Sequence, residues 1–103
     1  MSRWDSREER DKLYRKALDK WGKAGQMCKA IEECCELGAS MSRVLNSPVG
    51  HDPVQELEKM LGELVDVKIM AEQMELAFGE FGAHMKTIRD AKLDRLEGFL
   101  KEN

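Results

Sequence analysis

The sequence contains few residues that interrupt helices. Of its 103 residues only two are proline, Pro48 and Pro53, and both lie near the middle of the chain. Because proline breaks helices, its absence elsewhere leaves room for long helices on both sides. The helix formers Ala, Leu, Met, Glu and Lys dominate, whereas Val, Ile and Thr are few. This composition predicts an all-α fold.

Other features that would define a class of protein are also missing. No apolar run approaches the ~20 residues of a membrane-spanning helix, and no signal peptide is visible. The net charge is −3 and no block of Lys and Arg stands out, which argues against a nucleic acid polymer as partner. The three cysteines form no CxxC pair, so neither a disulfide framework nor a zinc site is expected. We therefore expect a cytoplasmic protein with reduced thiols and no membrane partner.

A chain of this length is expected to form one domain, and we interpret residues 1–103 as a single helical domain with a flexible segment at 1–7. The apolar spacing predicts four helices, at about 8–21, 26–45, 53–78 and 83–100. Stretches rich in turn residues separate them, namely "WGKAG" (21–25), "NSPVGHDP" (46–53) and "GEFG" (79–82). Asp52 followed by Pro53 is typical of a helix N-cap with proline at the first helical position.

The stretch "AIEECCELG" (30–38) crowds three acids into the second predicted helix. Glu32, Glu33 and Glu36 fall within an arc of about 100° on a helical wheel. That arc lies roughly opposite an apolar face, which comprises Met27, Ile31, Cys34, Gly38, Met41 and Leu45. Acids opposite an apolar face are normally solvated. This helix alone therefore predicts an ordinary acidic surface, with Cys34 and its neighbours in the core.

The third predicted helix carries acids where apolar residues are expected. Glu63 lies in the middle of an apolar stripe and Asp66 at its edge, the stripe being Met60, Val67, Met70, Met74 and Ala77. The ordinary polar face of this helix is elsewhere and carries Lys68, Glu72 and Glu75. A buried carboxylate without a partner costs several kcal/mol or takes up a proton. Glu63 and Asp66 are therefore expected to pair with cations or to bind a metal ion.

A second apolar line on the third helix consists of Val65, Ile69 and Leu76, on the far side from Glu63. A helix that is apolar on two sides sits between two layers. Two explanations fit this pattern: the line is a dimer interface, or the first helix covers it within the monomer.

The last predicted helix supplies candidate cations. Lys92 and Arg95 fall within or beside its apolar stripe, which comprises Phe81, Met85, Ile88, Leu96 and Phe99. One interpretation is a structural salt bridge from these two residues to Glu63 or Asp66. The other is a metal centre in which carboxylates from two neighbouring helices converge, with the cations holding a phosphate-bearing substrate.

The choice of metal follows from the ligands. All-oxygen ligation favours Mg²⁺, or Mn²⁺ as a substitute, over iron or zinc. A di-iron centre of the ferritin type is a further alternative, but it uses Glu-x-x-His pairs on its helices. The only histidines, His51 and His84, do not have that spacing.

Two acidic motifs carry a resemblance to a known family. "EECCE" (32–36) and "ELVD" (63–66), with 26 residues between them, resemble the EExxE and ExxD motifs of the MazG-like nucleoside triphosphate pyrophosphohydrolases. These enzymes belong to the all-α NTP pyrophosphatase superfamily. The flanking stretches "KWGKAGQMCKAIEECCEL", "GELVDVKIMAEQMELAFG" and "AKLDRLEGFL" are similar as well, so that the resemblance covers about residues 12–100. The chain is most similar to the short, single-domain members.

The resemblance implies a four- to five-helix bundle that works as a homodimer or homotetramer. It also implies Mg²⁺-dependent hydrolysis of a nucleoside or deoxynucleoside triphosphate to the monophosphate and pyrophosphate. By position, the metal ligands would be Glu33, Glu36, Glu63 and Asp66. Glu32 would be a further ligand, or would orient or deprotonate the attacking water, which makes Glu32 and Glu33 the expected catalytic residues. Lys92 and Arg95 would hold the triphosphate.

The nucleobase of such a substrate is expected in an apolar slot near the first helix. Trp21 or Tyr14 could stack on the base and Gln26 could hydrogen-bond its edge, whereas the alternative for Trp21 is a place in the core. Two enzymes of the same superfamily remain as alternatives, a dUTPase-like enzyme and a phosphoribosyl-ATP pyrophosphatase-like enzyme. A third alternative of another class is a non-catalytic helical adaptor whose acids are merely structural.

Overall fold

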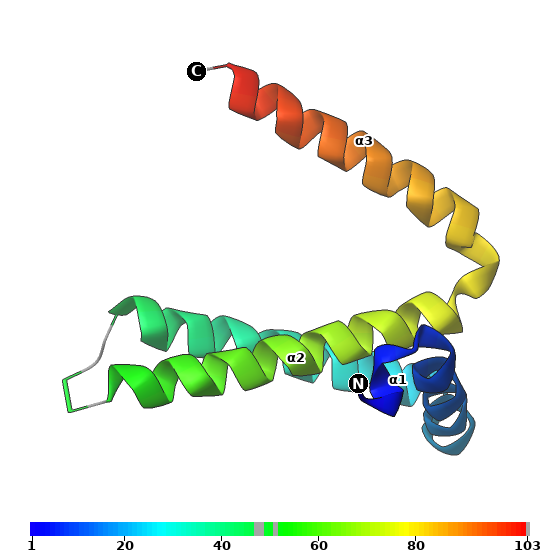
Figure 1. The fold of residues 1–103 in the computed structure, drawn as a ribbon, viewed down its shortest axis with the longest axis horizontal. Coiled ribbons are helices and arrows are strands. Elements are labelled where there is room, and N and C mark those ends of the chain that lie inside the picture. Colours follow the sequence, from blue (N-terminus) through cyan, green and yellow to red (C-terminus); the bar gives the residue numbers. More distant parts are fainter. Residues whose placement is uncertain (47–48, 51, 103) are drawn as a thin grey trace.

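The computed structural model describes residues 1–46, 49–50 and 52–102, and their regular structure is entirely helical (Figure 1). The elements are, in chain order, η1 (Arg3–Asp5), α1 (Arg7–Asn46), α2 (Pro53–Ala77), η2 (Gly79–Phe81) and α3 (Gly82–Lys101). No strand occurs in this part of the chain, which confirms the predicted all-α fold. None of the helices described here combines the length and the apolar character that crossing a membrane requires.

The start of α2 follows the predicted N-cap. Asp52 Oδ1 accepts a hydrogen bond from the backbone N–H of Val54 at 2.8 Å, and Pro53 opens the first turn. Pro48 and His51, which belong to the predicted loop at 46–53, lie outside the described residues.

The N-terminal segment, for which the sequence predicts flexibility, contains a hydrogen-bonded turn. Ser2 Oγ accepts a hydrogen bond from the Trp4 N–H at 3.0 Å, and Asp5 Oδ2 accepts one from the Ser2 N–H at 3.0 Å. This reciprocal pair is a capping box at the start of η1. The turn is also held from outside, because Arg10 Nη1 donates to the Trp4 carbonyl at 2.7 Å.

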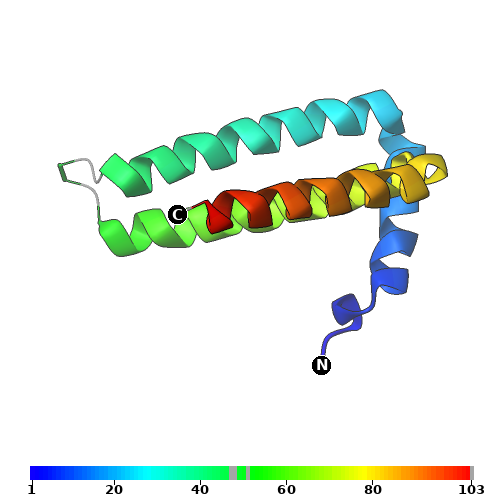
Figure 2. The same cartoon turned by 90° about the horizontal axis from the view of Figure 1, so that it is seen from above.

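A kink at Gly22 divides α1 into two arms. Gly22 has φ 79° and ψ 160°, a conformation that residues with a side chain rarely adopt. The N-terminal arm (7–21) therefore turns sharply away from the C-terminal arm (23–46), as the blue and cyan ribbons show in Figure 2. The break predicted at "WGKAG" is thus a single residue within an otherwise continuous helix.

The C-terminal arm of α1 lies beside α2, and the residues buried along this contact are mostly polar (Figure 2). The buried polar residues are Gln26, Glu33, Ser40, Glu56 and Gln73, whereas only Tyr14 and Met70 are buried hydrophobic residues in the described part of the chain. Gln26, Glu33 and Ser40 are spaced by seven residues along α1, which is the spacing of positions that repeatedly face one neighbouring helix. We refer to this contact as the polar seam.

The apolar face of the C-terminal arm is exposed, so its assignment to the core is wrong for the single chain. Ile31 is 64% exposed and Leu45 84%, and Cys34 is exposed as well. The same inversion applies to Glu33, for which the pattern of this helix alone predicts a solvated surface, because Glu33 is buried. The helical wheel separates the acidic face of this arm from its apolar face. It cannot tell which of the two faces meets α2, because that depends on the residues of α2.

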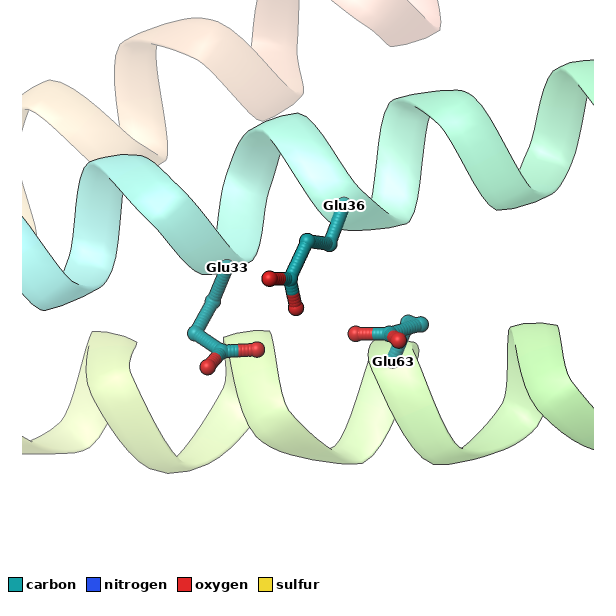
Figure 3. A group of neighbouring side chains, drawn as sticks. All are labelled: Glu33, Glu36 and Glu63. Atoms are coloured by element: carbon teal, nitrogen blue, oxygen red, sulfur yellow. The ribbon is translucent and has the colours of Figure 1, made fainter.

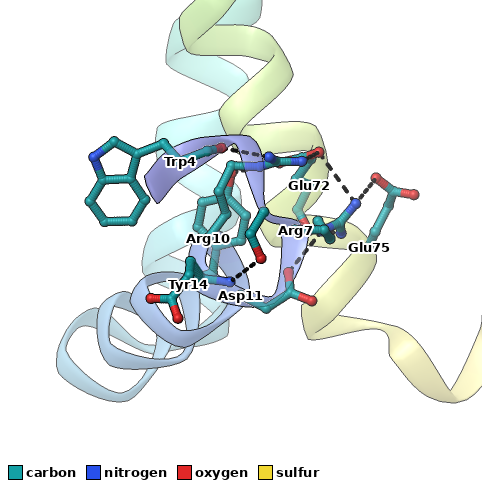
Figure 4. A network of polar contacts seen from close by, with 9 residues as sticks. Trp4, Arg7, Arg10, Asp11, Tyr14, Glu72 and Glu75 are labelled. Atoms are coloured by element: carbon teal, nitrogen blue, oxygen red, sulfur yellow. Dashed lines mark hydrogen bonds and ion pairs between the residues drawn. The ribbon is translucent and has the colours of Figure 1, made fainter. Parts of the chain in front are cut away.

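The N-terminal arm is held against α2 by a network of charged and polar groups around Glu72 (Figure 4). Arg10 donates from Nε to Glu72 Oε1 at 2.8 Å and from Nη2 to Oε2 at 3.0 Å, and the Tyr14 hydroxyl donates to Oε1 at 2.7 Å. Arg7 Nη1 adds a contact to Oε2 at 3.3 Å. These hydrogen bonds lower the pKa of Glu72 to about 2, Arg10 contributing most and burial opposing the shift. Burial, followed by the bond to Glu72, raises the pKa of Tyr14 to about 12.

The second apolar line of α2 is covered only in part. Ile69 borders a cleft with Leu13 and Tyr14 of the N-terminal arm, so the first helix does reach this line. Val65, one turn earlier, is 53% exposed. Ile69 itself is 40% exposed, so the N-terminal arm reaches this line without burying it.

The third helix projects away from the other two. It leaves the end of α2 through η2 and forms an open V with the α1–α2 pair (Figure 1). The hydrogen bonds and ion pairs described for α3 join residues within α3 itself. A single chain is therefore a kinked helical hairpin with a projecting arm, and it does not close a four-helix bundle.

Candidate metal centre and adjoining cleft

Three of the four predicted metal ligands converge at the polar seam. Glu33 and Glu36 lie one turn apart on α1, and Glu63 faces them from α2, with the three side chains directed toward one another (Figure 3). One carboxylate oxygen from each lies within 4.8 Å of the others. We call these three residues the acid group. Their convergence from two helices is the arrangement that a helical bundle uses to build a metal site.

The acid group contains carboxylate oxygens that lack partners. Glu33 is only 6% exposed. Its Oε2 and the Oε2 of Glu63 are buried and accept no hydrogen bond. Nearby positive charge is limited, since Lys29 Nζ approaches Glu33 Oε1 at 3.1 Å from a half-exposed position on the rim. A buried hydrogen-bond acceptor that receives no hydrogen bond lowers the stability of the fold. A group of ligand atoms that are all oxygen suits a hard cation such as Mg²⁺.

The carboxylates of the acid group repel one another, and this repulsion raises the pKa of Glu36. The neighbouring carboxylate of Glu33, followed by burial and by Glu63, raises the pKa of Glu36 above its ordinary value. A cation among these oxygens would reverse that effect. The residues present therefore fit a divalent cation.

The other two acids named from the motifs lie outside the acid group. Glu32 is exposed beside Glu33, with one oxygen 3.8 Å from Lys29 Nζ. Asp66 lies about one turn beyond Glu63 on α2, and it is exposed. Both residues border the acid group without joining it.

The predicted phosphate-binding cations are separated from the acids. Lys92 and Arg95 are exposed on α3, and the Arg95 guanidinium lies 5.4 Å from the centre of the Phe99 ring. No ion pair described for the chain connects either residue with Glu63 or Asp66. The interpretation of a structural salt bridge within the chain therefore finds no contact among the described residues.

The three residues predicted to bind a nucleobase line one apolar cleft. Tyr14, Trp21 and Gln26 border a cavity of about 360 Å³ between the N-terminal arm and α2. Trp21 is 59% exposed, so the alternative of a core position is wrong for the single chain. The cleft is also bordered by Ile69 of the second apolar line, and by residues for which the sequence patterns indicated no binding role: Leu13, Lys16, Ala17, Lys20 and Gln73.

A buried pair of amides links the cleft to the polar seam. Gln26 Nε2 donates to Gln73 Oε1 at 2.8 Å, and Gln73 Nε2 contacts Met70 Sδ at 3.6 Å. Gln73 could have been found from the sequence, because it lies three residues after Met70 of the stripe that contains Glu63. Gln26 and Glu33 are two helical turns apart on the same face of α1, which corresponds to about 10 Å. The cleft and the acid group therefore lie in line along α1.

Comparisons of the chain with known family models, with curated proteins and with solved structures found no match in any of the three. The chemistry of the site therefore rests on its own residues.

Proposed function

We propose that the chain is a Mg²⁺-dependent nucleoside triphosphate pyrophosphohydrolase, which converts a nucleoside or deoxynucleoside triphosphate to the monophosphate and pyrophosphate. The observation that carries this proposal is the pair of buried, unpartnered carboxylate oxygens of Glu33 and Glu63. The order and spacing of the EExxE and ExxD motifs in the sequence add support. The proposal also implies a homo-oligomer, as the resemblance to the MazG-like enzymes does.

The acid group would hold the metal ion. Glu33, Glu36 and Glu63 would supply the first ligands, and Asp66, an exposed acid about one turn beyond Glu63 on α2, would be the fourth. When bound, Mg²⁺ neutralises the carboxylates, binds phosphate oxygens and lowers the pKa of water. Glu32 lies exposed at the side of the group, where its carboxylate can accept a proton from an attacking water.

The cleft would hold the nucleobase. Its lining is apolar, the exposed Trp21 ring can stack on a flat heterocycle, and the Gln26–Gln73 amides offer donors and acceptors to its edge. The distance of about 10 Å along α1 between Gln26 and Glu33 leaves room for a ribose and phosphates between base and metal. A nucleotide therefore suits the combined site better than a free phosphate does.

A panel of nucleotides tests the proposed function. The full chain is incubated with each canonical NTP and dNTP, with dUTP and with phosphoribosyl-ATP, in the presence of Mg²⁺ or Mn²⁺, and the products are identified. The proposal expects pyrophosphate and the monophosphate from at least one member. Preference for dUTP or phosphoribosyl-ATP would instead favour the corresponding alternative enzyme. If pyrophosphate is released from none of them, the catalytic proposal is wrong and the helical adaptor gains support.

The substitution Trp21→Ala tests the place of the nucleobase. Loss of one stacking surface is expected to raise KM about tenfold and to leave kcat within about twofold, since stacking on one aromatic ring contributes about 1–3 kcal/mol. The matched control is Trp4→Ala, because Trp4 is the other tryptophan of the chain, is 41% exposed and borders an adjoining cleft that Trp21 does not line. If the two substitutions change KM and kcat equally, the proposal that the nucleobase binds in the cleft beside Trp21 is wrong.

A further inference from the structure

Three buried side chains form a line of hydrogen bonds that ends at the cleft. Gln73 Nε2 donates to Met70 Sδ at 3.6 Å, and Gln26 Nε2 donates to Gln73 Oε1 at 2.8 Å. Met70 and Gln26 are each 6% exposed and Gln73 is 7% exposed, so water has little access to these bonds. In such an interior a hydrogen bond is stronger than at the surface, and an unpaired polar group is costly. The direction in which each amide points is therefore important for this contact.

The sulfur of Met70 determines the direction of both amides. A thioether is a weak acceptor and has no proton to donate, so it accepts from Gln73 Nε2 and would repel Gln73 Oε1. Gln73 Oε1 is thereby directed toward α1, where it can only accept a hydrogen bond. Gln26 supplies the donor and turns its Nε2 toward Gln73. The carbonyl oxygen of Gln26 is then the end of the line.

This oxygen is open to the cleft. Gln26 Oε1 accepts no hydrogen bond from any residue that the structure describes. Unlike Glu33 Oε2 and Glu63 Oε2, it is not enclosed by the protein. Because Gln26 borders the cleft, the cleft is where a ligand can reach this oxygen.

The other polar side chains of the cleft differ from Gln26 in what they offer. Lys16 and Lys20 carry only donors, and the indole of Trp21 also only donates. Gln73 Oε1 is already engaged by Gln26. Gln26 Oε1 is therefore the free side-chain carbonyl in the described lining of the cleft, and its complement is a ligand that carries an N–H group.

We propose that Met70 and Gln73 hold the Gln26 amide with its carbonyl oxygen toward the cleft, and that the ligand of the cleft must present an N–H group to this oxygen. The ligand class is a heterocycle with a ring N–H or an exocyclic amino group at its edge. Met70 and Gln73 are positioning residues, because they act through Gln26. The direction of the amides stands on the contacts alone, whereas a nucleotide as the ligand rests on the proposed function.

Nuclear magnetic resonance of the full chain, labelled with ¹³C and ¹⁵N, tests the direction of the amides. We expect a scalar coupling across the hydrogen bond between the side-chain nitrogen of Gln26 and the side-chain carbonyl carbon of Gln73. A coupling from the Gln73 nitrogen to the Gln26 carbonyl carbon, or no coupling in either direction, would overturn the proposal. This result is the same whether or not the protein hydrolyses nucleotides.

Substrate analogues test the requirement for an N–H group. The substrate that the nucleotide panel identifies is compared with the triphosphate of purine riboside or of pyrimidin-2-one riboside, whose rings carry no N–H. We expect kcat/KM to be at least about tenfold lower for the analogue, because Gln26 Oε1 is then covered without a partner. Equal values would overturn the ligand class and leave the proposed function standing. Release of pyrophosphate from no nucleotide would defeat the proposed function and the ligand class together, while the coupling still decides the direction of the amides.

Met70→Leu tests whether the sulfur sets the direction. Leucine fills a similar volume but accepts no hydrogen bond, so both amides can reverse and Gln26 can turn its Nε2 to the cleft. We expect the preference for the substrate over its analogue to shrink at least about threefold, and the coupling from the Gln26 nitrogen to weaken. Met74→Leu is the matched control, since it makes the same change at a half-buried position of α2, and it should keep both wild-type values. A wild-type preference and coupling in Met70→Leu would overturn the role of Met70.

Discussion

The substitution Glu63→Gln is expected to lower turnover at least about 100-fold, since even groups that only support metal ligands cost about 10–100-fold when they are lost. Glu63 Oε2 is a buried oxygen without a partner, and it faces Glu33 and Glu36 from the opposite helix. The amide keeps the size of the side chain but removes one of the three charges that attract the cation. Steady-state release of pyrophosphate measures the loss.

The same substitution is expected to change thermal stability in opposite directions with and without metal. Wild-type protein should gain about 2.7 kcal/mol at a Mg²⁺ concentration of about 100 times Kd, and Glu63→Gln should lose that gain. Without metal the variant should be the more stable protein, because repulsion within the acid group is relieved. Thermal melts followed by circular dichroism, with and without Mg²⁺, measure both effects.

The control for Glu63 is Glu58→Gln, which makes the same chemical change at an exposed position of α2. This variant should keep wild-type turnover and the wild-type response to Mg²⁺. Stabilisation by Mg²⁺ that persists in Glu63→Gln would contradict a metal site at the acid group. A wild-type protein whose melting does not respond to Mg²⁺ or Mn²⁺ would favour the helical adaptor.

The helices themselves could be predicted from local sequence. Asp52 and Pro53 define the start of α2 through groups that are adjacent in the chain, and the glycine-rich stretch 21–25 contains the kink. Such signals are local because a cap or a left-handed residue involves only its nearest neighbours. The ordered turn at Arg3–Asp5 was missed, although Ser2 and Asp5 have the spacing of a capping box.

The orientation of the helices could not be predicted in the same way. Periodicity divides the C-terminal arm of α1 into an acidic and an apolar face, and the usual rule turns the apolar face inward. In this chain only one edge of the acidic face turns inward. Glu33 lies near Glu63, and Gln26 bonds Gln73 across the seam, whereas Glu32 and Glu36 are exposed. The rule assumes a complete hydrophobic core, whereas Tyr14 and Met70 are the only buried hydrophobic residues in the described part of this chain.

The candidate site could be predicted where a residue conflicted with its own helix. Glu63 stands in an apolar stripe, and this conflict indicated a special role before any partner was known. Glu72 gave no such signal, since it lies on the polar face of α2 and was interpreted as ordinary surface. Its partner Arg10 is 62 residues away in sequence, a separation at which local patterns carry no information.

Glu72→Gln is expected to loosen the N-terminal arm and to destabilise the protein at neutral pH. In the folded chain the pKa of Glu72 is lowered from 4.5 to about 2, so its ionised form is the one that folding favours. Because the group keeps a quarter of its surface exposed, solvent screening reduces the effect, and we expect a loss of about 1–2 kcal/mol at pH 7. That corresponds to a fall in Tm on the order of 5–15 °C for a chain of this size.

The pH dependence of this effect has a definite sign. A carboxylate with a lowered pKa stabilises the folded state above its unfolded pKa, and that stabilisation disappears as the pH falls from about 4.5 toward 2. Wild type should therefore lose stability over this interval, whereas Glu72→Gln should lose less, so that the two proteins converge at low pH. Denaturant unfolding at pH 7 and near pH 3 measures the difference.

The control is Glu75→Gln, because Glu75 has only a 3.8 Å contact with Arg7. The stability of this variant should stay within about 0.5 kcal/mol of wild type at both pH values. A constant gap between wild type and Glu72→Gln across this interval would mean that the charge of Glu72 does not hold the arm.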